Sequence, residues 1–406
     1  MSNLRPSCRY APGKPVRFKP GEMRCRTAIF FFIGIMLVFG AILSAAEDKA
    51  EPLTGANWLL FMHRARKGDA RAQTRLGIAY QKGEFVNQDS LEAVRWFSKA
   101  AKQGDLAAEH NLGVMYYGGA GVPCDHSEAL KWFERAAAGG LAQGQFAAAL
   151  QYELGDGAAQ NLGRAFELYR NAATSGYSPA QENLGRMYEK GEGIARNLAA
   201  AVDWYTRAAR QGDAIGQFDL GVMFSHGSGV PQDFARAAEL FQLAAEQGHV
   251  RAQILLAEMY ELGEGIPRDD RAAVTWLRKA AEQGDATAQN KLGFHYFNGQ
   301  GCSADEAIAA TWFSKAAEQG NHNAQANLAT LYQLGQGAPR DLNRAYMWRL
   351  VSLHGTDLRQ NAELRDLATA MSKSDIAEAE TRASNWLQSH KKNEARAVEP
   401  TFVMLH

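Results

Sequence analysis

The chain has 406 residues, more than a single hydrophobic core normally holds, which predicts either several domains or one repetitive array. Hydrophobic residues make up 46% of it, and 44 lysines and arginines balance 44 aspartates and glutamates. This composition is typical of a folded soluble protein and offers no basic field for binding nucleic acid.

Residues 1–46 have the composition of a targeting segment. Seven basic residues and one acid precede Glu47, and the uncharged run AIFFFIGIMLVFGAILSAA fills residues 28–46. The run is near the lower limit for spanning a bilayer and long for the core of a signal peptide. It is therefore either a cleaved signal peptide, ending in the small residues Ser44, Ala45 and Ala46, or an uncleaved anchor. Translation could begin at Met1 or at Met23.

Both alternatives predict export, because a basic flank holds the N-terminus in the cytosol and sends the rest of the chain across the membrane. The expected location is the periplasm, with anchoring to the inner membrane, the repeats lying outside the cytosol, as the alternative. Any contact with the membrane is expected only through residues 28–46, if they stay uncleaved.

From residue 69 onward the sequence repeats with a period of 36 residues. Glycine precedes each repeat, at Gly68, Gly104, Gly140, Gly176, Gly212, Gly248, Gly284 and Gly320. A period of this length predicts a solenoid, in which each unit buries its apolar face against the next. Eight units fit within residues 69–355, and places within a unit are counted here from Asp69 as place 1.

The first helix of each unit has a small residue at place 4 and an aromatic residue at place 12, on one helical face. Small residues at place 9, such as Gly113 and Gly293, predict close approach by a neighbouring helix, because glycine inside a helix costs up to about 1 kcal/mol. Glycine at place 15 predicts the end of the helix. The further glycines at place 17 indicate turns rather than a phosphate-binding loop, which would need a lysine and a serine or threonine.

The second helix opens after aspartate or asparagine at place 21, both good helix caps. Place 28 carries a large residue in every unit: Trp96, Trp132, Leu168, Trp204, Leu240, Trp276, Trp312 and Trp348. These side chains are predicted to lie in the core between stacked helix pairs.

The lines AEQGDATAQNKLGFHYFNGQG and AAKQGDLAAEHNLGVMYYGGAGVP resemble the Sel-one-like repeat (SLR) of bacterial proteins, a relative of the tetratricopeptide repeat. The resemblance covers residues 69–355 and implies an all-α, right-handed α/α solenoid of eight helix-turn-helix units. It also implies that residues 47–68 are a linker and a front capping helix, and that residues 356–390 form C-terminal capping helices. Residues 391–406 are predicted to be a disordered tail.

The face of the first helix that does not pack in the core, at places 6, 7, 10, 13 and 14, is free to be shaped by a ligand. Similarity to tetratricopeptide arrays implies that this face lines a concave groove for a protein or peptide. The predicted anchors are Phe146, Phe218, Phe294 and Phe297, and the predicted polar partners are Asn111, Asn183, Arg186 and Asn327. The alternative is that these phenylalanines pack against the first helix of the adjacent unit.

No catalytic motif is found. The ten histidines occupy unrelated places and no HExxH or cysteine–histidine spacing occurs, so we expect no catalytic residue, metal site or cofactor. Glu109 and His110 adjoin, but neighbours on a helix point about 100° apart, and both are expected at the surface.

The leading hypothesis is a non-enzymatic scaffold or adaptor of the bacterial cell envelope that binds an unidentified protein or peptide. A second is a cell-envelope hydrolase acting on β-lactams or peptidoglycan fragments, as suggested for cysteine-rich relatives whose paired cysteines this chain lacks. A third is a membrane-anchored assembly factor tethered by residues 28–46.

Overall fold

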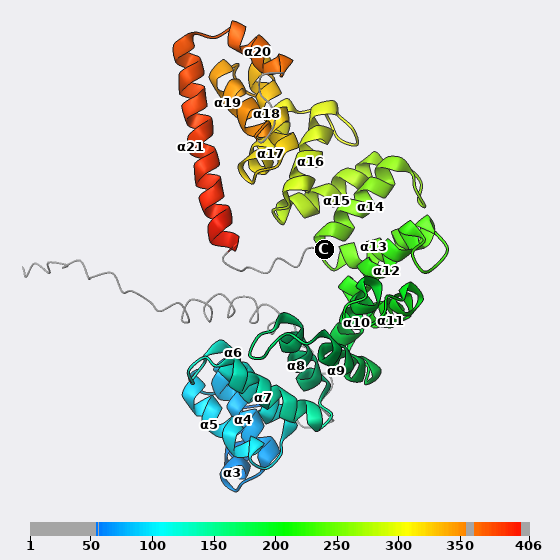
Figure 1. Ribbon diagram of the computed structural model, residues 1–406, viewed down its shortest axis with the longest axis vertical. Coiled ribbons are helices and arrows are strands. Elements are labelled where there is room, and N and C mark those ends of the chain that lie inside the picture. Colours follow the sequence, from blue (N-terminus) through cyan, green and yellow to red (C-terminus); the bar gives the residue numbers. More distant parts are fainter. Residues whose placement is uncertain (1–53, 56, 355–360, 399–406) are drawn as a thin grey trace, which may run out of the picture. The chain divides into compact units, whose positions relative to one another are not determined.

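The computed structural model describes residues 54–55, 57–354 and 361–398, and all regular structure in this part of the chain is helical (Figure 1). The expected signal peptide or anchor, residues 1–46, lies outside the described residues. Within those residues, no helix is both long enough and apolar enough to cross a bilayer. The chain divides into two compact units, residues 1–168 and 169–406, each described by itself.

The first unit consists of successive helices that pack in pairs. They are α3 (Trp58–Arg66), α4 (Ala70–Lys82), α5 (Ser90–Ala101), α6 (Leu106–Gly118), α7 (His126–Ala138), α8 (Ala142–Leu154) and the start of α9 (Leu162–Thr174). Helix α4 packs on α5 and α6 on α7 within repeats, while α5 packs on α6 and α7 on α8 between repeats. Helix α3 packs on α4, in the position of a preceding second helix.

The second unit continues the same pattern. After the end of α9 come α10 (Ser178–Lys190), α11 (Leu198–Arg210), α12 (Ala214–His226), α13 (Phe234–Glu246), α14 (Val250–Leu262), α15 (Asp270–Glu282), α16 (Ala286–Asn298), α17 (Glu306–Glu318), α18 (His322–Leu334), α19 (Leu342–Ser352), α20 (Ala362–Thr369) and α21 (Lys373–Val398). Both α20 and α21 pack on α19 at the end of the stack. Residues 391–398, predicted to begin a disordered tail, instead continue α21.

Helix boundaries follow from the residues that recur at each end. The Asp105 carboxylate accepts a hydrogen bond from the Ala108 amide at 2.8 Å, and the Asp125 carboxylate accepts one from the Glu128 amide at 2.9 Å. Both satisfy amide groups that the first turn of a helix leaves unpaired. Gly119 ends α6 with a φ of 65°, a conformation that costs glycine little. The predicted helix starts and ends are therefore confirmed.

In the first seven repeats, the most deeply buried large residue of the second helix lies one place later than predicted. At place 29, Phe97, Phe133 and Phe241 are buried completely or almost completely. At place 28, Leu168 and Trp348 are buried as predicted, but the other five tryptophans are half-buried. A basic side chain three residues on covers the outer face of each of these five rings. The Lys279 ammonium lies 3.9 Å from the centre of the Trp276 ring, for example. These tryptophans therefore mark the edge of the core.

The glycine at place 9 makes room for this core aromatic residue. A Cβ added at Gly113 would lie 2.5 Å from the Phe133 ring, and one at Gly293 would lie 2.8 Å from the Phe313 ring. Real Cβ contacts are not this short, so the two helices of a repeat can approach this closely only because the side chain is absent. The predicted close approach is confirmed.

A buried glutamine at place 5 also joins successive repeats, and it is a feature that the sequence analysis missed. Gln253 donates to the carbonyl oxygen of Ala245 in the preceding repeat at 3.1 Å and accepts a hydrogen bond from Gln283 at 2.9 Å. Gln289 repeats both contacts with Ala281 and Gln319. Because these amides are buried, each bond satisfies a polar group that would otherwise be costly.

Candidate functional site

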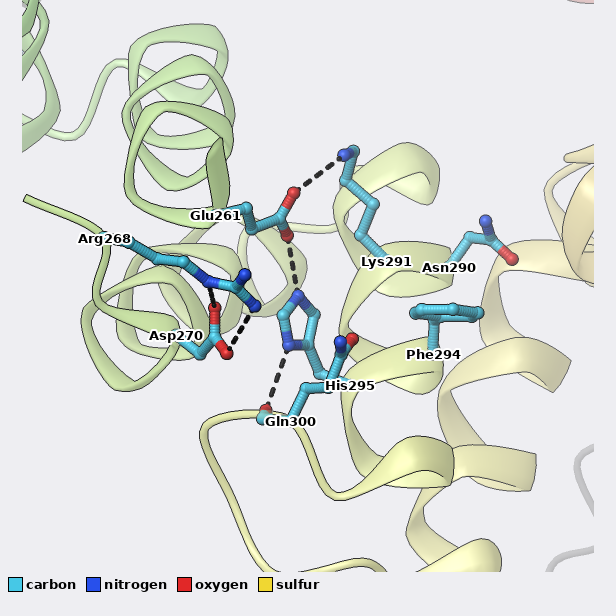
Figure 2. Close-up of a pocket in the computed structure, with 8 residues that line it drawn as sticks. All are labelled: Glu261, Arg268, Asp270, Asn290, Lys291, Phe294, His295 and Gln300. Atoms are coloured by element: carbon cyan, nitrogen blue, oxygen red, sulfur yellow. Dashed lines mark hydrogen bonds and ion pairs between the residues drawn. The ribbon is translucent and has the colours of Figure 1, made fainter. Parts of the chain in front are cut away.

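A pocket of about 320 Å³ lies in the second unit, between the first helices of the sixth and seventh repeats (Figure 2). Its walls come from α14, from the loop leading into α15 and the first residue of α15, from α16 and from the loop that follows α16. The lining residues are Glu261, Arg268, Asp270, Asn290, Lys291, Phe294, His295 and Gln300. Phe294 is one of the anchors predicted from the sequence.

His295 connects the walls of this pocket. Its Nε2 lies 2.6 Å from Glu261 Oε1, and its Nδ1 donates to the backbone carbonyl of Gln300 at 3.0 Å. Burial lowers the pKa of His295, but the hydrogen bonds to Glu261 and Gln300 and the charges of Glu261 and Asp270 raise it above its usual value overall. A protonated imidazole donates from both nitrogens, which is the arrangement that these two acceptors favour.

The other charged groups of the pocket are paired with one another. Lys291 Nζ lies 3.0 Å from Glu258 Oε1 and 3.6 Å from Glu261 Oε2, joining the first helices of adjacent repeats. Arg268 makes two hydrogen bonds to Asp270, at 3.1 and 3.0 Å, and these lower the pKa of that carboxyl. Because these acids and bases lie next to one another, the pocket has no large excess of positive or negative charge.

An exposed surface adjoins these pairs. The Phe294 side chain is 51% exposed, and Asn290 lies one turn earlier on the same helix (Figure 2). Asn327 on α18 donates to Asn290 Oδ1 at 3.0 Å, which extends the polar surface to the eighth repeat. An exposed aromatic ring beside amide groups can bury an apolar side chain and hydrogen-bond the chain that carries it.

Phe218 has a different position from Phe294. It is only 4% exposed, and its ring stacks on His249 at 4.4 Å and tilts against Phe241 at 5.8 Å. His249 begins the next repeat, so the alternative of packing against the adjacent unit holds for this residue. Phe218 is therefore a core residue and not an exposed anchor. Phe297 is half-buried and packs on the core of the seventh and eighth repeats.

Asn183 and Arg186 belong to a separate polar network in the fourth repeat. Arg186 pairs with Glu192 at 2.7 Å and donates to Asn183 Oδ1 at 3.1 Å. Nearby on α12, burial, reinforced by Glu189, raises the pKa of Asp219 to about 7 despite the counteracting charge of Arg186. Only 11% of the Arg186 side chain is exposed, and both partners lie on α10 or in the loop that follows it, so Arg186 is not an open polar anchor.

The first unit contains the remaining predicted residues. Asn111 on α6 and Phe146 on α8 are both half-buried. Glu109 and His110, expected at the surface, are both buried, and that expectation is wrong. Glu109 occupies the buried place 5 and accepts a hydrogen bond from Arg135 at 2.7 Å, while burial lowers the pKa of His110 to about 4.

Of the eight residues that line the pocket, only Phe294 was among the predicted site residues, and Glu261 and His295 are two of the seven that were missed. Glu261 is at place 13, which belongs to the open face of the first helix, so its exposure to the pocket could have been predicted from the repeat pattern. His295 is at place 11, beside the aromatic place 12, and no sequence signal distinguished it from a core residue. Across the part of the chain that the structure describes, no three histidine, cysteine or acidic side chains are grouped so that they could hold a metal ion.

Comparison with protein families gives a match to the Sel1 repeat over eight consecutive segments. They are residues 70–105, 106–141, 142–177, 178–213, 214–249, 250–285, 286–321 and 322–348. Together they span more than half of the chain, and their register agrees with the helix pairs described above. No curated protein matches the chain.

Two solved structures of bacterial proteins are similar to the chain. A Sel1 repeat protein from Oxalobacter formigenes is 31% identical, over 80% of this chain and 96% of that one, with a TM-score of 0.59. A protective antigen of uropathogenic Escherichia coli strains that displays an SLR fold is also 31% identical, over 83% of this chain and 88% of that one, with a TM-score of 0.45.

Proposed function

The chain belongs to the Sel1 repeat family, whose members are generally protein-interaction scaffolds, and on this basis we propose that it is a protein-interaction scaffold. We further propose, from residues 1–46, that it acts in the bacterial cell envelope. The proposed binding surface is the first-helix face around Phe294, Asn290 and Asn327. Its occupant is a protein segment that presents an apolar side chain to Phe294 and hydrogen-bonding groups to the two asparagines.

The observation that carries this proposal is the half-exposed Phe294 ring at the edge of the pocket. A large apolar side chain surrounded by polar groups is typical of the central residues of protein interfaces. The acids and bases beside it are engaged in mutual pairs, which favours recognition over acid–base catalysis, because a catalytic group must reach its substrate.

Capture of envelope proteins by the immobilised chain tests the surface. Phe294→Ser is expected to reduce capture about tenfold or more, because a central aromatic contact is worth at least about 1.4 kcal/mol. Ile308→Ser on α17 is the matched control, since Ile308 is an exposed apolar residue on a second helix of the same repeat. Equal capture by the wild type and Phe294→Ser would remove the assignment.

The envelope location is proposed from residues 1–46, with their basic flank and apolar run. Sequencing the N-terminus of the protein from fractionated cells tests it. A start at Glu47 in the periplasmic fraction indicates cleavage, and a retained N-terminus in the membrane fraction indicates the anchored form. Recovery of an uncleaved chain in the cytosolic fraction would contradict export.

A further inference from the structure

Helix α3, at the front of the first unit, carries two faces of different chemistry. Phe61 and Ala65 are buried against α4, whereas Leu59 and Leu60 are 76% and 54% exposed. On the same outer side lie the exposed side chains of His63 and Arg66, in the last turn of the helix, and of Lys67, its C-cap residue. The outward face of α3 is therefore apolar at its start and basic at its end.

Phe85 adds a third exposed apolar side chain beside α3. It occupies place 17, where every later repeat has glycine, and it keeps the left-handed backbone conformation with a φ of 64°. In the later repeat that contains Gly121, a Cβ would overlap the Ser90 carbonyl group of the preceding second helix. At the front there is space for the Phe85 ring, which is 49% exposed and stacks on Trp58 at 5.9 Å.

The backbone conformation of Phe85 is unfavourable for any residue with a side chain and persists only where the surrounding structure supports it. The front of the stack therefore retains an exposed aromatic residue that strains the backbone. We call the group Leu59, Leu60, Phe85, His63, Arg66 and Lys67 the front patch. A cluster of exposed apolar side chains on a folded protein is typical of a binding surface for a protein or a membrane.

The charge around the front patch indicates what it binds. Residues 57–85 contain six lysines and arginines and two acids, Asp69, which pairs with Arg64 at 2.6 Å, and Glu84, which lies 3.7 Å from Lys82. Residues 47–406 as a whole carry 37 basic and 43 acidic residues. Arg66 and Lys67 form no ion pair within the residues that the structure describes. The local positive charge is thus opposite in sign to the net charge of residues 47–406 as a whole.

We propose that the front patch docks on the surface of an anionic lipid bilayer. Leucines and an aromatic ring enter the interface between headgroups and acyl chains, while Arg66 and Lys67 contact the anionic headgroups. The inference rests on the proposed role of residues 28–46, because α3 begins at Trp58, a dozen positions after Ala46, and so remains within roughly 40 Å of that segment. A second copy fits less well, since a symmetric contact would place the same basic residues against each other.

Photo-crosslinking in vesicles tests the docking. The full chain is reconstituted with a benzophenone amino acid at position 60, or at position 262 as control, because Leu262 is 67% exposed on α14 in the second unit. In vesicles of phosphatidylglycerol and phosphatidylethanolamine, lipid adducts are expected at position 60 at about ten times the yield at position 262. The yield at position 60 falls toward the control in phosphatidylcholine vesicles and in the Arg66→Gln/Lys67→Gln variant.

Phe85→Gly separates docking from folding. The change removes the backbone strain and the exposed ring, so the thermal midpoint is expected to stay unchanged or rise while the lipid adduct at position 60 falls. Equal adduct yields at positions 60 and 262 in anionic vesicles would overturn the proposal. So would adducts at position 60 with a second copy, with residues 1–53 of the same chain, or with another protein. Each of these results leaves the Phe294 capture experiment unaffected.

Discussion

Phe218 and Phe294 show how two identical residues on equivalent helices come to have different roles. Both lie on first helices, at places 6 and 10, and the sequence pattern predicted both to be exposed anchors. Phe218 is enclosed by Phe241 and by His249 of the next repeat, whereas Phe294 faces the pocket. The sequence could not separate them, because the burial of place 6 depends on the residue that begins the next repeat.

Replacing these two residues should have opposite consequences. Phe218→Ala is expected to lower the free energy of unfolding by about 3 to 5 kcal/mol, because it leaves a cavity in the core. Phe294→Ala is expected to change it by less than about 0.5 kcal/mol, because half of its side chain is already in water. Urea unfolding followed by circular dichroism measures both. A larger loss for Phe294→Ala than for Phe218→Ala would show that the burial has been assigned wrongly.

His295 makes the contact between the sixth and seventh repeats sensitive to pH. Because its pKa in the folded protein is raised above the usual value of 6.5, its stabilising contribution is complete below about pH 6.5 and is lost as the pH rises through the folded pKa. The pKa of Glu261 is lowered, since the contacts with His295 and Lys291 outweigh the opposing effect of burial. The stabilisation that the Glu261 carboxylate gives to the fold is therefore complete above about pH 4.5, and it is lost as the pH falls through the pKa of Glu261 in the folded protein.

The His295→Gln variant tests this dependence. The difference in unfolding free energy between the wild type and His295→Gln is expected to be largest between about pH 5 and 6 and to shrink above neutral pH. His322→Gln, at the exposed start of α18, serves as the control. A difference that stays constant from pH 5 to 8 would mean that the imidazole does not change its charge in this range.

At the scale of helices, the 36-residue period predicted the elements closely because each boundary depends on a local signal. Aspartate and asparagine caps start the helices, and left-handed glycines end them. The polar contacts between helices were harder to predict. The glutamine at place 5 could have been read as a surface residue, and only the structure shows that its amide joins the carbonyl of the preceding repeat to the glutamine at place 35.

The energetic coupling between Gln253 and Gln283 can be measured by mutation. Gln283→Ala is expected to destabilise the fold by about 1 to 2 kcal/mol, because it leaves the buried Gln253 Oε1 without its donor. Combined with Gln253→Ala in a double-mutant cycle, it should give a coupling energy of about 1 kcal/mol. Gln300→Ala provides an exposed control. Additive effects of the two changes would show that the side-chain contact contributes nothing.

At the scale of the whole molecule, the fold class was predictable because the period itself specifies a solenoid, in which stability comes from contacts between neighbouring repeats. The number of repeats and the family were confirmed by comparison with known proteins. The candidate site was predicted only in part, since Phe294 and Asn327 were foreseen but Glu261 and His295 were not. A pocket depends on side chains from two repeats, and a periodic pattern treats each repeat alone.

Site-specific crosslinking in living cells tests most directly whether the first-helix face is the binding surface. A benzophenone amino acid placed at position 294, and in a matched strain at position 308 on α17, samples two exposed apolar positions in the same repeat. Irradiation is expected to yield a discrete protein adduct from position 294, with little or none from position 308. Adducts from position 308 alone, or equal adducts from both positions, would contradict the assignment of the binding surface to the face around Phe294.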